Sequence, residues 1–130
     1  MTVSSFTSVA LSPPLVMISL QRETRTHALI VESGVFGVTI LAESQQAISE
    51  RFAGNTADDE DRFAGLESLT LVTGAPFLSG GLAFMDCRVV NSQVIGEQTV
   101  FFAEILALET APEGRPLAYH DRHYHGLQDI

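Results

Sequence analysis

The sequence predicts a mainly β protein: an antiparallel barrel with two short helices at its ends. Two long strand-like segments, residues 81–94 and 99–109, flank a tight turn at residues 95–98 and form the clearest hairpin in the chain. Shorter apolar segments bounded by Gly and Pro precede this hairpin, and the connections are of turn length. Many strands with two short helices favour this antiparallel architecture.

The composition is that of a single globular domain covering residues 1–130. Hydrophobic residues make up 45% of the chain and charged residues 18%, which is enough apolar sequence for a modest core. The single cysteine, Cys87, excludes an internal disulfide and suits a reducing compartment. No segment reads as a signal peptide or approaches the roughly 20 apolar residues of a membrane span. We therefore expect a cytoplasmic protein with no membrane partner.

The charge balance limits the kinds of partner. The chain has 16 acidic side chains against 7 basic ones, a formal net charge of −9, and it contains no lysine. A nucleic-acid surface needs clustered Lys and Arg, so we expect no nucleic-acid partner. A small anionic ligand remains open, because hydroxyls, backbone N–H groups and one Arg can hold a phosphate locally.

The first half of the chain predicts strands separated by turns and helices. Residues 2–11 begin with hydroxyl side chains on a strand-like pattern, and Pro13 and Pro14 fix the turn that follows. Residues 15–20 and 35–41 are apolar enough to form buried strands.

Two short helices are expected around the second of these strands. Thr24 is a suitable N-cap for the first helix, and Gly34 ends it. Ser44 is the expected cap of the second helix, in which Ile48 and Phe52 are spaced i, i+4 on one apolar face.

The second half of the chain contains an acidic loop and further strands. Asp58, Asp59, Glu60 and Asp61 could suggest calcium, yet the ligand spacing and glycine of an EF-hand are missing, so we expect a solvated loop. A short strand is predicted at residues 69–72, and a last strand or extended tail at residues 119–127.

Two groups of residues invite a catalytic or metal interpretation. His120, Asp121, His123 and His125 are competent ligands, but in a strand His120 would point away from the other two histidines, so a surface tail is the simpler interpretation. Cys87 has no neighbouring His or helix start to activate it, which predicts a small buried hydrophobe. Any enzymatic activity would then rest on a bound cofactor rather than on a reactive side chain.

Small polar residues gather at strand ends and helix starts in three places. These are "TVSSFTS" at the start, "SLQRETRTH" after the next strand, and "AESQQ" before the second helix. Hydroxyls and free N–H groups of this kind can hold a phosphate and the edge of a flat heterocycle. Ordinary caps and turns use the same residue types, so both interpretations stay open at this point.

Four segments follow one another in a characteristic order: "MTVSSFTSVALSPPLVMISLQRETRTHALI", "LAESQQAISERFAG", "GEQTVFFAEILALE" and "PLAYHDRHYHGL". Together they resemble the flavin reductase family with the FMN-binding split-barrel fold, over nearly the whole chain. The resemblance implies a Greek-key antiparallel split barrel and a homodimer with flavin near the subunit interface. It also implies FMN or FAD as cofactor, NADH or NADPH as co-substrate, and a flavin-dependent monooxygenase as partner.

The resemblance also implies which residues contact the flavin. The ring and ribityl chain would lie against the first polar segment, the end of the next strand and the turn before the second helix. The phosphate would be held by the hydroxyls at the first helix start, with Arg22 or Arg25 beside them. The cofactor-binding residues so implied are Thr2, Val3, Ser4, Ser5, Ser19, Leu20, Thr24, Thr26, Ala42, Glu43, Ser44, Gln45, Gln98 and Tyr124, with His125 in the same aromatic motif as Tyr124.

The chain departs from the family pattern in two places. The usual Gly-Asp-His is Gly96-Glu97-Gln98 here, and Gln98 can form hydrogen bonds but cannot carry a proton. Family members also begin with a helix and a strand before the hydroxyl motif, so we expect the chain to be an N-terminally incomplete domain. The expected function is hydride transfer from NAD(P)H to flavin. The alternatives are a flavin-binding barrel without reductase activity and, less favoured, a metal or haem binder that uses the histidine-rich tail.

Overall fold

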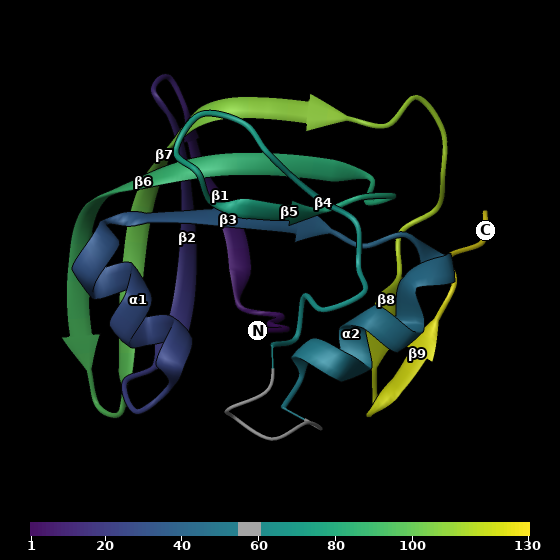
Figure 1. The fold of residues 1–130 in the computed structure, drawn as a ribbon, viewed down its shortest axis with the longest axis horizontal. Helices are drawn as coiled ribbons and strands as arrows, with labels where there is room; N and C mark the ends of the chain where they lie inside the picture. Colours follow the sequence, from purple (N-terminus) through teal and green to yellow (C-terminus); the bar gives the residue numbers. More distant parts are fainter. Residues whose placement is uncertain (55–60) are drawn as a thin grey trace.

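A five-stranded antiparallel sheet forms most of the molecule in the computed structural model, which describes residues 1–54 and 61–130. Its strand order is β1–β2–β7–β6–β3 (Figure 1). The bounds are Phe6–Leu11 for β1, Pro14–Gln21 for β2, Val35–Ile40 for β3, Ala83–Ile95 for β6 and Gln98–Thr110 for β7. The acidic loop expected around residues 58–61 lies largely outside the described residues.

The β6–β7 hairpin is the longest pairing in the sheet, as the sequence predicts. Its strands extend one residue further than expected at the turn, which consists of Gly96 and Glu97 alone. The first half of β7 also pairs with β2, whereas the first half of β6 pairs with β3. Two register shifts along β6, after Asp86 and after Val89, bend the hairpin between these partners. The sheet therefore curls as a barrel requires.

Helix α1, Arg25–Ser33, has both of the predicted ends. The Thr24 hydroxyl accepts a hydrogen bond from the His27 N–H at 3.2 Å, and Gly34, at φ 73°, donates its N–H to the Ile30 carbonyl at 2.8 Å. Ile30 is the buried residue through which the helix packs on the sheet.

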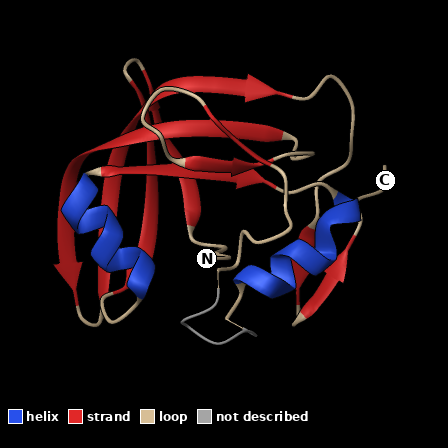
Figure 2. Ribbon diagram, viewed as in Figure 1, coloured by secondary structure: helices blue, strands red, loops and turns tan. Residues whose placement is uncertain are grey.

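The second helix begins differently from the prediction. A 3₁₀ turn, Glu43–Gln45, precedes helix α2, Gln46–Phe52, so Ser44 lies within this turn and is not the N-cap. Ala42 is the N-cap of the turn, and the side chain of Gln45, three residues on, reaches back so that its Oε1 accepts from the Ala42 N–H at 2.9 Å. Figure 2 shows α1 and α2 on opposite sides of the N-terminal segment.

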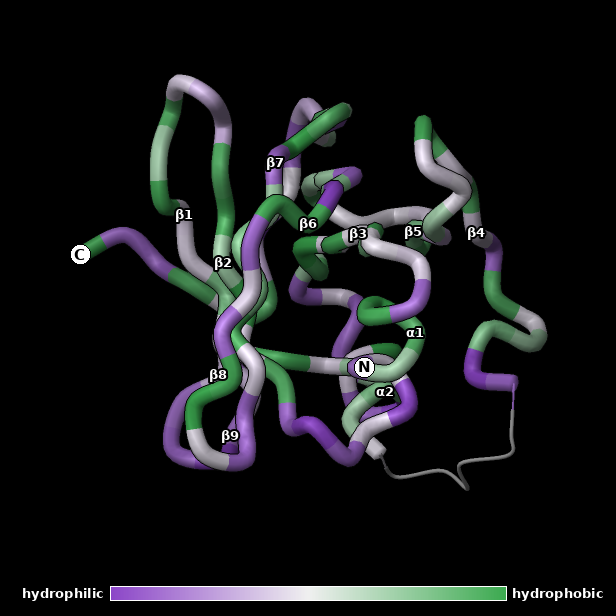
Figure 3. The backbone as a smooth tube through the Cα atoms, turned by 90° about the vertical axis from the view of Figure 1, so that its left-hand side faces the viewer, coloured by the Kyte–Doolittle hydropathy of each residue, from purple (hydrophilic) through white to green (hydrophobic). Residues whose placement is uncertain are grey.

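Two small hairpins complete the described fold. Strand β4, Ser68–Thr70, pairs with β5, Pro76–Leu78, and β8, Ala118–His120, pairs with β9, His123–His125. The strand predicted at residues 69–72 is thus shorter than expected, and β5 was not predicted because Pro76 follows a turn-like sequence. The predicted last strand is instead a hairpin, whose turn is hydrophilic in Figure 3. Within the described ranges, no helix has the length and apolar content of a membrane span.

The core lies on the concave side of the sheet. It is built from alternate residues of the central strands and from α1: Val16, Ile18, Leu20, Ile30, Phe36, Met85, Cys87, Phe101 and Ala103. Cys87 is fully buried, as predicted, and burial together with the adjacent Asp86 charge raises the pKa of its thiol to about 12. This thiol is a core residue and not a nucleophile.

Asp86 is a fully buried carboxylate that holds the turn between β4 and β5. Its two oxygens accept hydrogen bonds from the Val72 N–H at 2.8 Å, the Thr73 N–H at 2.8 Å and the Thr73 hydroxyl at 2.5 Å. Burial alone would raise the pKa of Asp86, but these bonds and the Cys87 N–H outweigh it and leave the pKa below its ordinary value.

We expect Asp86→Asn to lower the free energy of unfolding by about 3 kcal/mol at pH 7, because the amide carries no charge and turns an NH₂ group toward the N–H donors. Chemical denaturation measures the loss, with exposed Asp129→Asn as the control. A depressed pKa stabilises the fold above the unfolded pKa and ceases to do so as the pH falls through the folded value. The difference between the two proteins should therefore shrink below about pH 4, and a difference independent of pH would contradict this account.

Candidate functional site

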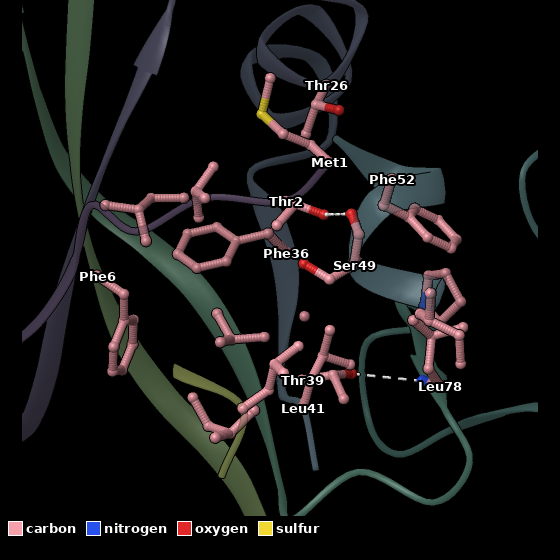
Figure 4. Close-up of a pocket in the computed structure, with 18 of the residues that line it drawn as sticks. Met1, Thr2, Phe6, Thr26, Phe36, Thr39, Leu41, Ser49, Phe52 and Leu78 are labelled. Atoms are coloured by element: carbon pink, nitrogen blue, oxygen red, sulfur yellow. Dashed lines mark hydrogen bonds between the residues drawn. The ribbon is translucent and has the colours of Figure 1, made fainter. Parts of the chain in front are cut away.

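An apolar cavity of about 330 Å³ opens beside the core, between the sheet, helix α2 and the β8–β9 hairpin. Strand residues Leu20 and Phe36 form part of its wall, and the N-terminal segment crosses it (Figure 4). A volume of this size is within the range of small-molecule sites. The residues that line it from outside the five-stranded sheet are Met1, Thr2, Val3, Thr26, Ile30, Leu41, Ile48, Ser49, Phe52, Phe63, Pro76, Leu78, Leu117, Tyr119 and Tyr124.

Three polar side chains in this wall are tied together. The Thr2 hydroxyl donates to the Ser49 carbonyl at 2.6 Å, and the Thr2 N–H donates to the Phe52 carbonyl at 2.9 Å. The Ser49 hydroxyl lies 3.0 Å from the Tyr124 hydroxyl, and either oxygen can be the donor. One turn of α2 thereby fixes both the N-terminal segment and the C-terminal hairpin.

A second, more polar cavity of about 980 Å³ adjoins the first at the start of helix α1. The two cavities share Met1, Thr2, Thr26, Phe52 and Phe63. Arg22, Arg25 and Arg62 line the second cavity with Thr24, while Glu23 and Asp61 are its acidic residues. Three of the seven basic side chains of a chain with net charge −9 therefore meet at one place. The positive charge of these three arginines would attract an anion to this cavity.

The two threonines at the start of α1, Thr24 and Thr26, differ in their surroundings. Thr24 caps the helix and also donates to the Gln21 carbonyl at 2.9 Å. Thr26 borders both cavities. Arg22 donates to the Gly96 carbonyl at 3.1 Å, which anchors the guanidinium at the β6–β7 turn.

The structure brings six of the predicted site residues to these cavities: Thr2, Val3, Leu20, Thr24, Thr26 and Tyr124. Ser4, Ser5, Ser19, Ala42, Ser44, Gln45 and Gln98 do not line either one. Glu43 and His125 are likewise outside both linings.

Ser5, Ser19 and Gln98 form a chain of hydrogen bonds between the segment before β1 and the strands β2 and β7. The Ser5 hydroxyl donates to the Ser19 carbonyl at 2.7 Å and accepts from the Ser19 N–H at 3.3 Å. The Ser19 hydroxyl donates to the Gln98 Oε1 at 3.3 Å. These groups join the start of the chain to β2 and β7.

The turn before α2 is held by Gln45. This side chain is buried, and its amide donates to the Ser79 carbonyl at 3.2 Å in addition to its bond with Ala42. The helix that follows reaches the cavity through Ile48, Ser49 and Phe52. Sequence reasoning placed Ile48 and Phe52 on the apolar face but missed Ser49, for which the signal was its position three residues before Phe52 on the helix.

The histidine-rich segment forms the β8–β9 hairpin. His120 pairs with His123, and the His120 and His125 rings lie 6.0 Å apart. Among the described residues, no group of three or more His, Cys, Asp or Glu is placed to hold a metal ion. Tyr119 and Tyr124, on the strands of the same hairpin, have ring centroids 5.0 Å apart with their planes inclined at 57°, and both line the apolar cavity.

This chain is similar in sequence and in fold to proteins already known. The family model described as "Flavin reductase like domain" matches residues 1–128. An NADH-dependent flavin reductase of Pseudomonas fluorescens is 38% identical over 129 residues, covering 97% of this chain and 72% of that protein. The reductase subunit of a flavin-dependent monooxygenase of Rhodococcus jostii is 36% identical over 124 residues, covering 95% of this chain and 62% of that protein.

The solved structure of a protein described as a "putative flavin reductase" from Haemophilus somnus superposes with a TM-score of 0.90 at 27% identity, covering 95% of this chain and 79% of that one. The likeness confirms the predicted antiparallel split barrel with two short helices. The chain spans about two thirds of the length of the curated relatives it matches. Its sequence and its fold together show that this chain belongs to the flavin reductase like domain family.

Proposed function

We propose that this chain is an NADH-dependent flavin reductase. The observation that carries the proposal is the apolar cavity that continues into an arginine-lined one. A flavin has the same two parts, a flat apolar ring system and a phosphate at the end of a polar chain. The similar P. fluorescens protein is named as an NADH-dependent flavin reductase, which supports the same activity here.

The residues present fit the cofactor in kind and in place. Leu20, Phe36 and Tyr124 offer apolar and aromatic surface to the ring. Thr26, which borders both cavities, lies where the ring system would give way to the phosphate chain. Arg22, Arg25 and Thr24 would hold the phosphate, with the start of α1 adding its partial positive charge. In FMN the chain attached to the ring ends at this phosphate, and in FAD it continues beyond the phosphate.

The chemistry of a bound flavin is to accept a hydride from NADH and to give up the electrons afterwards. The contribution of this chain is to bind, to align and to exclude water. The apolar wall keeps the ring edge dry, and the tie between Thr2 and Ser49 fixes the segment that crosses it. The reaction requires no nucleophile, which agrees with a Cys87 thiol whose pKa burial raises to about 12.

The reduced flavin is proposed to pass to a flavin-dependent monooxygenase. The similar R. jostii protein is named as the reductase subunit of such an enzyme, which supports this partner. Because NADH is held inside the cell, the proposed reaction implies a cytoplasmic location.

A homodimer is proposed as the functional form. Every second residue of β2 and β7 belongs to the core, and the residues between them point outward. Three of these outward residues are apolar: Met17, Val100 and Phe102. They are only partly buried, and they lie side by side in register: Met17 opposite Phe102, with Val100 two residues along β7. Such a cluster of apolar side chains on an outward face suits contact with a second copy of this chain.

We expect the protein to sediment at twice 14.1 kDa, and Phe102→Glu to shift it to the monomer, because the carboxylate would have to be buried without a partner. Leu11→Glu, at the exposed β1–β2 turn, is the control and should leave the mass unchanged. A monomeric wild type would refute the dimer.

One observation favours a second candidate, a flavin-binding barrel without reductase activity. Gln98 stands where the family resemblance predicts a histidine, and its side chain accepts a hydrogen bond from Ser19. A glutamine cannot carry a proton. The two candidates differ in whether NADH is consumed.

We expect NADH oxidation, followed at 340 nm, to rise with added FMN or FAD and to stay low without flavin. NADPH measured in parallel gives the preferred nicotinamide. Flavin binding without NADH oxidation would instead support the non-reducing barrel, and the absence of flavin binding would refute both candidates.

We expect Arg25→Gln combined with Thr26→Val to weaken FMN binding about tenfold or more and to leave riboflavin binding nearly unchanged. Charge-assisted hydrogen bonds to a phosphate contribute about 1.5–3 kcal/mol each, and riboflavin has no phosphate. Titration followed by flavin fluorescence measures both ligands. Arg88→Gln, whose side chain pairs with Glu104 on the surface, is the matched control. Equal losses for the two ligands would place the phosphate elsewhere.

A further inference from the structure

Ser49 sits at the junction of three segments that enclose the apolar cavity. It is a buried residue of helix α2, its carbonyl accepts from Thr2, and its hydroxyl lies 3.0 Å from that of Tyr124. We propose that Ser49 is a positioning residue: its hydroxyl sets the Tyr124 ring as a wall of the flavin site. The proposal rests on the function proposed above, since it concerns the same cavity.

The hairpin that carries Tyr124 is a weak element by itself. Strands β8 and β9 have three residues each and belong to a sheet separate from the five-stranded one. A hairpin of this kind is marginal in water without packing against another element. Its position therefore depends on contacts with the rest of the molecule.

The backbone contacts with the rest of the molecule are made by the residues that lead into β8, not by β9. Leu117, directly before β8, donates its N–H to the Leu41 carbonyl at 3.0 Å, and Pro116 bridges to Ala42. Tyr124 lies across the hairpin in β9, opposite Tyr119. The hydroxyl bond between Tyr124 and Ser49 therefore fixes the strand that these backbone bonds do not reach.

The orientation of the ring follows from two contacts. A tilted contact with the Tyr119 ring, at a centroid distance of 5.0 Å and an interplanar angle of 57°, sets one side of the Tyr124 ring, and the bond to Ser49 sets the end that carries the hydroxyl. A ring held in this way presents a fixed aromatic surface to a flat ligand. Without the second contact, the ring could turn about its side-chain bonds while Tyr119 remained beside it.

The two hydroxyls also depend on each other energetically. A buried hydroxyl with no partner loses the hydrogen bonds it had in water, so the buried Ser49 hydroxyl favours the conformation in which the Tyr124 hydroxyl lies beside it. Ser49 is nearly inaccessible, which leaves its side chain little room for a water in place of Tyr124. Removing either hydroxyl should therefore release the same contact.

The test compares Ser49→Ala, Tyr124→Phe and the double variant with the wild type. FMN is titrated into each, and the fluorescence lifetime of the bound flavin is measured, because a tyrosine in contact with the flavin ring quenches its emission. Thermal unfolding of the flavin-free proteins gives the structural effect separately. Ser92→Ala, an exposed serine on β6, is the matched control.

We expect Ser49→Ala to weaken FMN binding about threefold to tenfold and to lengthen the lifetime of the bound flavin, although Tyr124 itself is unchanged. In FMN affinity, the double variant should equal either single variant, because all three remove one contact. Ser92→Ala should match the wild type in both measurements.

Two outcomes would overturn the proposal in distinguishable ways. If the wild type binds FMN and Ser49→Ala leaves both the affinity and the lifetime unchanged while lowering only the melting temperature, Ser49 is merely structural and the proposed function stands. If the wild type binds no flavin, the proposed function fails, and the role given to Ser49 fails with it.

Discussion

The pairing of β6 with β7 is the constraint on which the rest of the structure depends. The two strands pair along their full length, but their other neighbours lie at opposite halves: β2 on β7 and β3 on β6. A flat sheet cannot satisfy both neighbours over one core, so the hairpin bends at its two register shifts. The core packs on one side of the bent sheet, and residues of β2, β3 and α2 together line the cavity beside it.

Features encoded by neighbouring residues could be predicted from the sequence. The cap and end of α1 follow from Thr24 and Gly34, and the long hairpin follows from its alternation and its turn. The elements that sequence reasoning missed depend on distant partners. Strand β5 exists because Phe77, fully buried, packs against Gly37, where a Cβ would lie 2.8 Å from its ring. No signal near Pro76 reports that contact.

In the candidate site too, the residues that could be predicted are marked by their local sequence, and those that could not depend on distant parts of the chain. Hydroxyls at strand ends and helix starts pointed to the region, and six of the predicted residues line the cavities. Several of the other predicted residues bind elsewhere in the chain: Gln45 closes a turn, and Ser19 joins two strands. Ser49 and Arg62 come from segments that become neighbours only in the folded chain. The family resemblance implied Arg22 or Arg25 beside the phosphate, but the acidic overall charge gave no sign that both would gather with Arg62, because net charge says nothing about where the charges lie.

The ties that close the cavity span long stretches of sequence, and this bears on how the chain folds. Thr2 and Ser49 are 47 residues apart, and Ser49 and Tyr124 are 75 apart, whereas the β6–β7 turn joins immediate neighbours. Contacts of high sequence separation carry a larger loop-closure entropy and form after local ones. The hairpin is therefore the natural nucleus, and the cavity is assembled last. Backbone amides around α2 and β9 would accordingly exchange with deuterium well before those at the centre of β7.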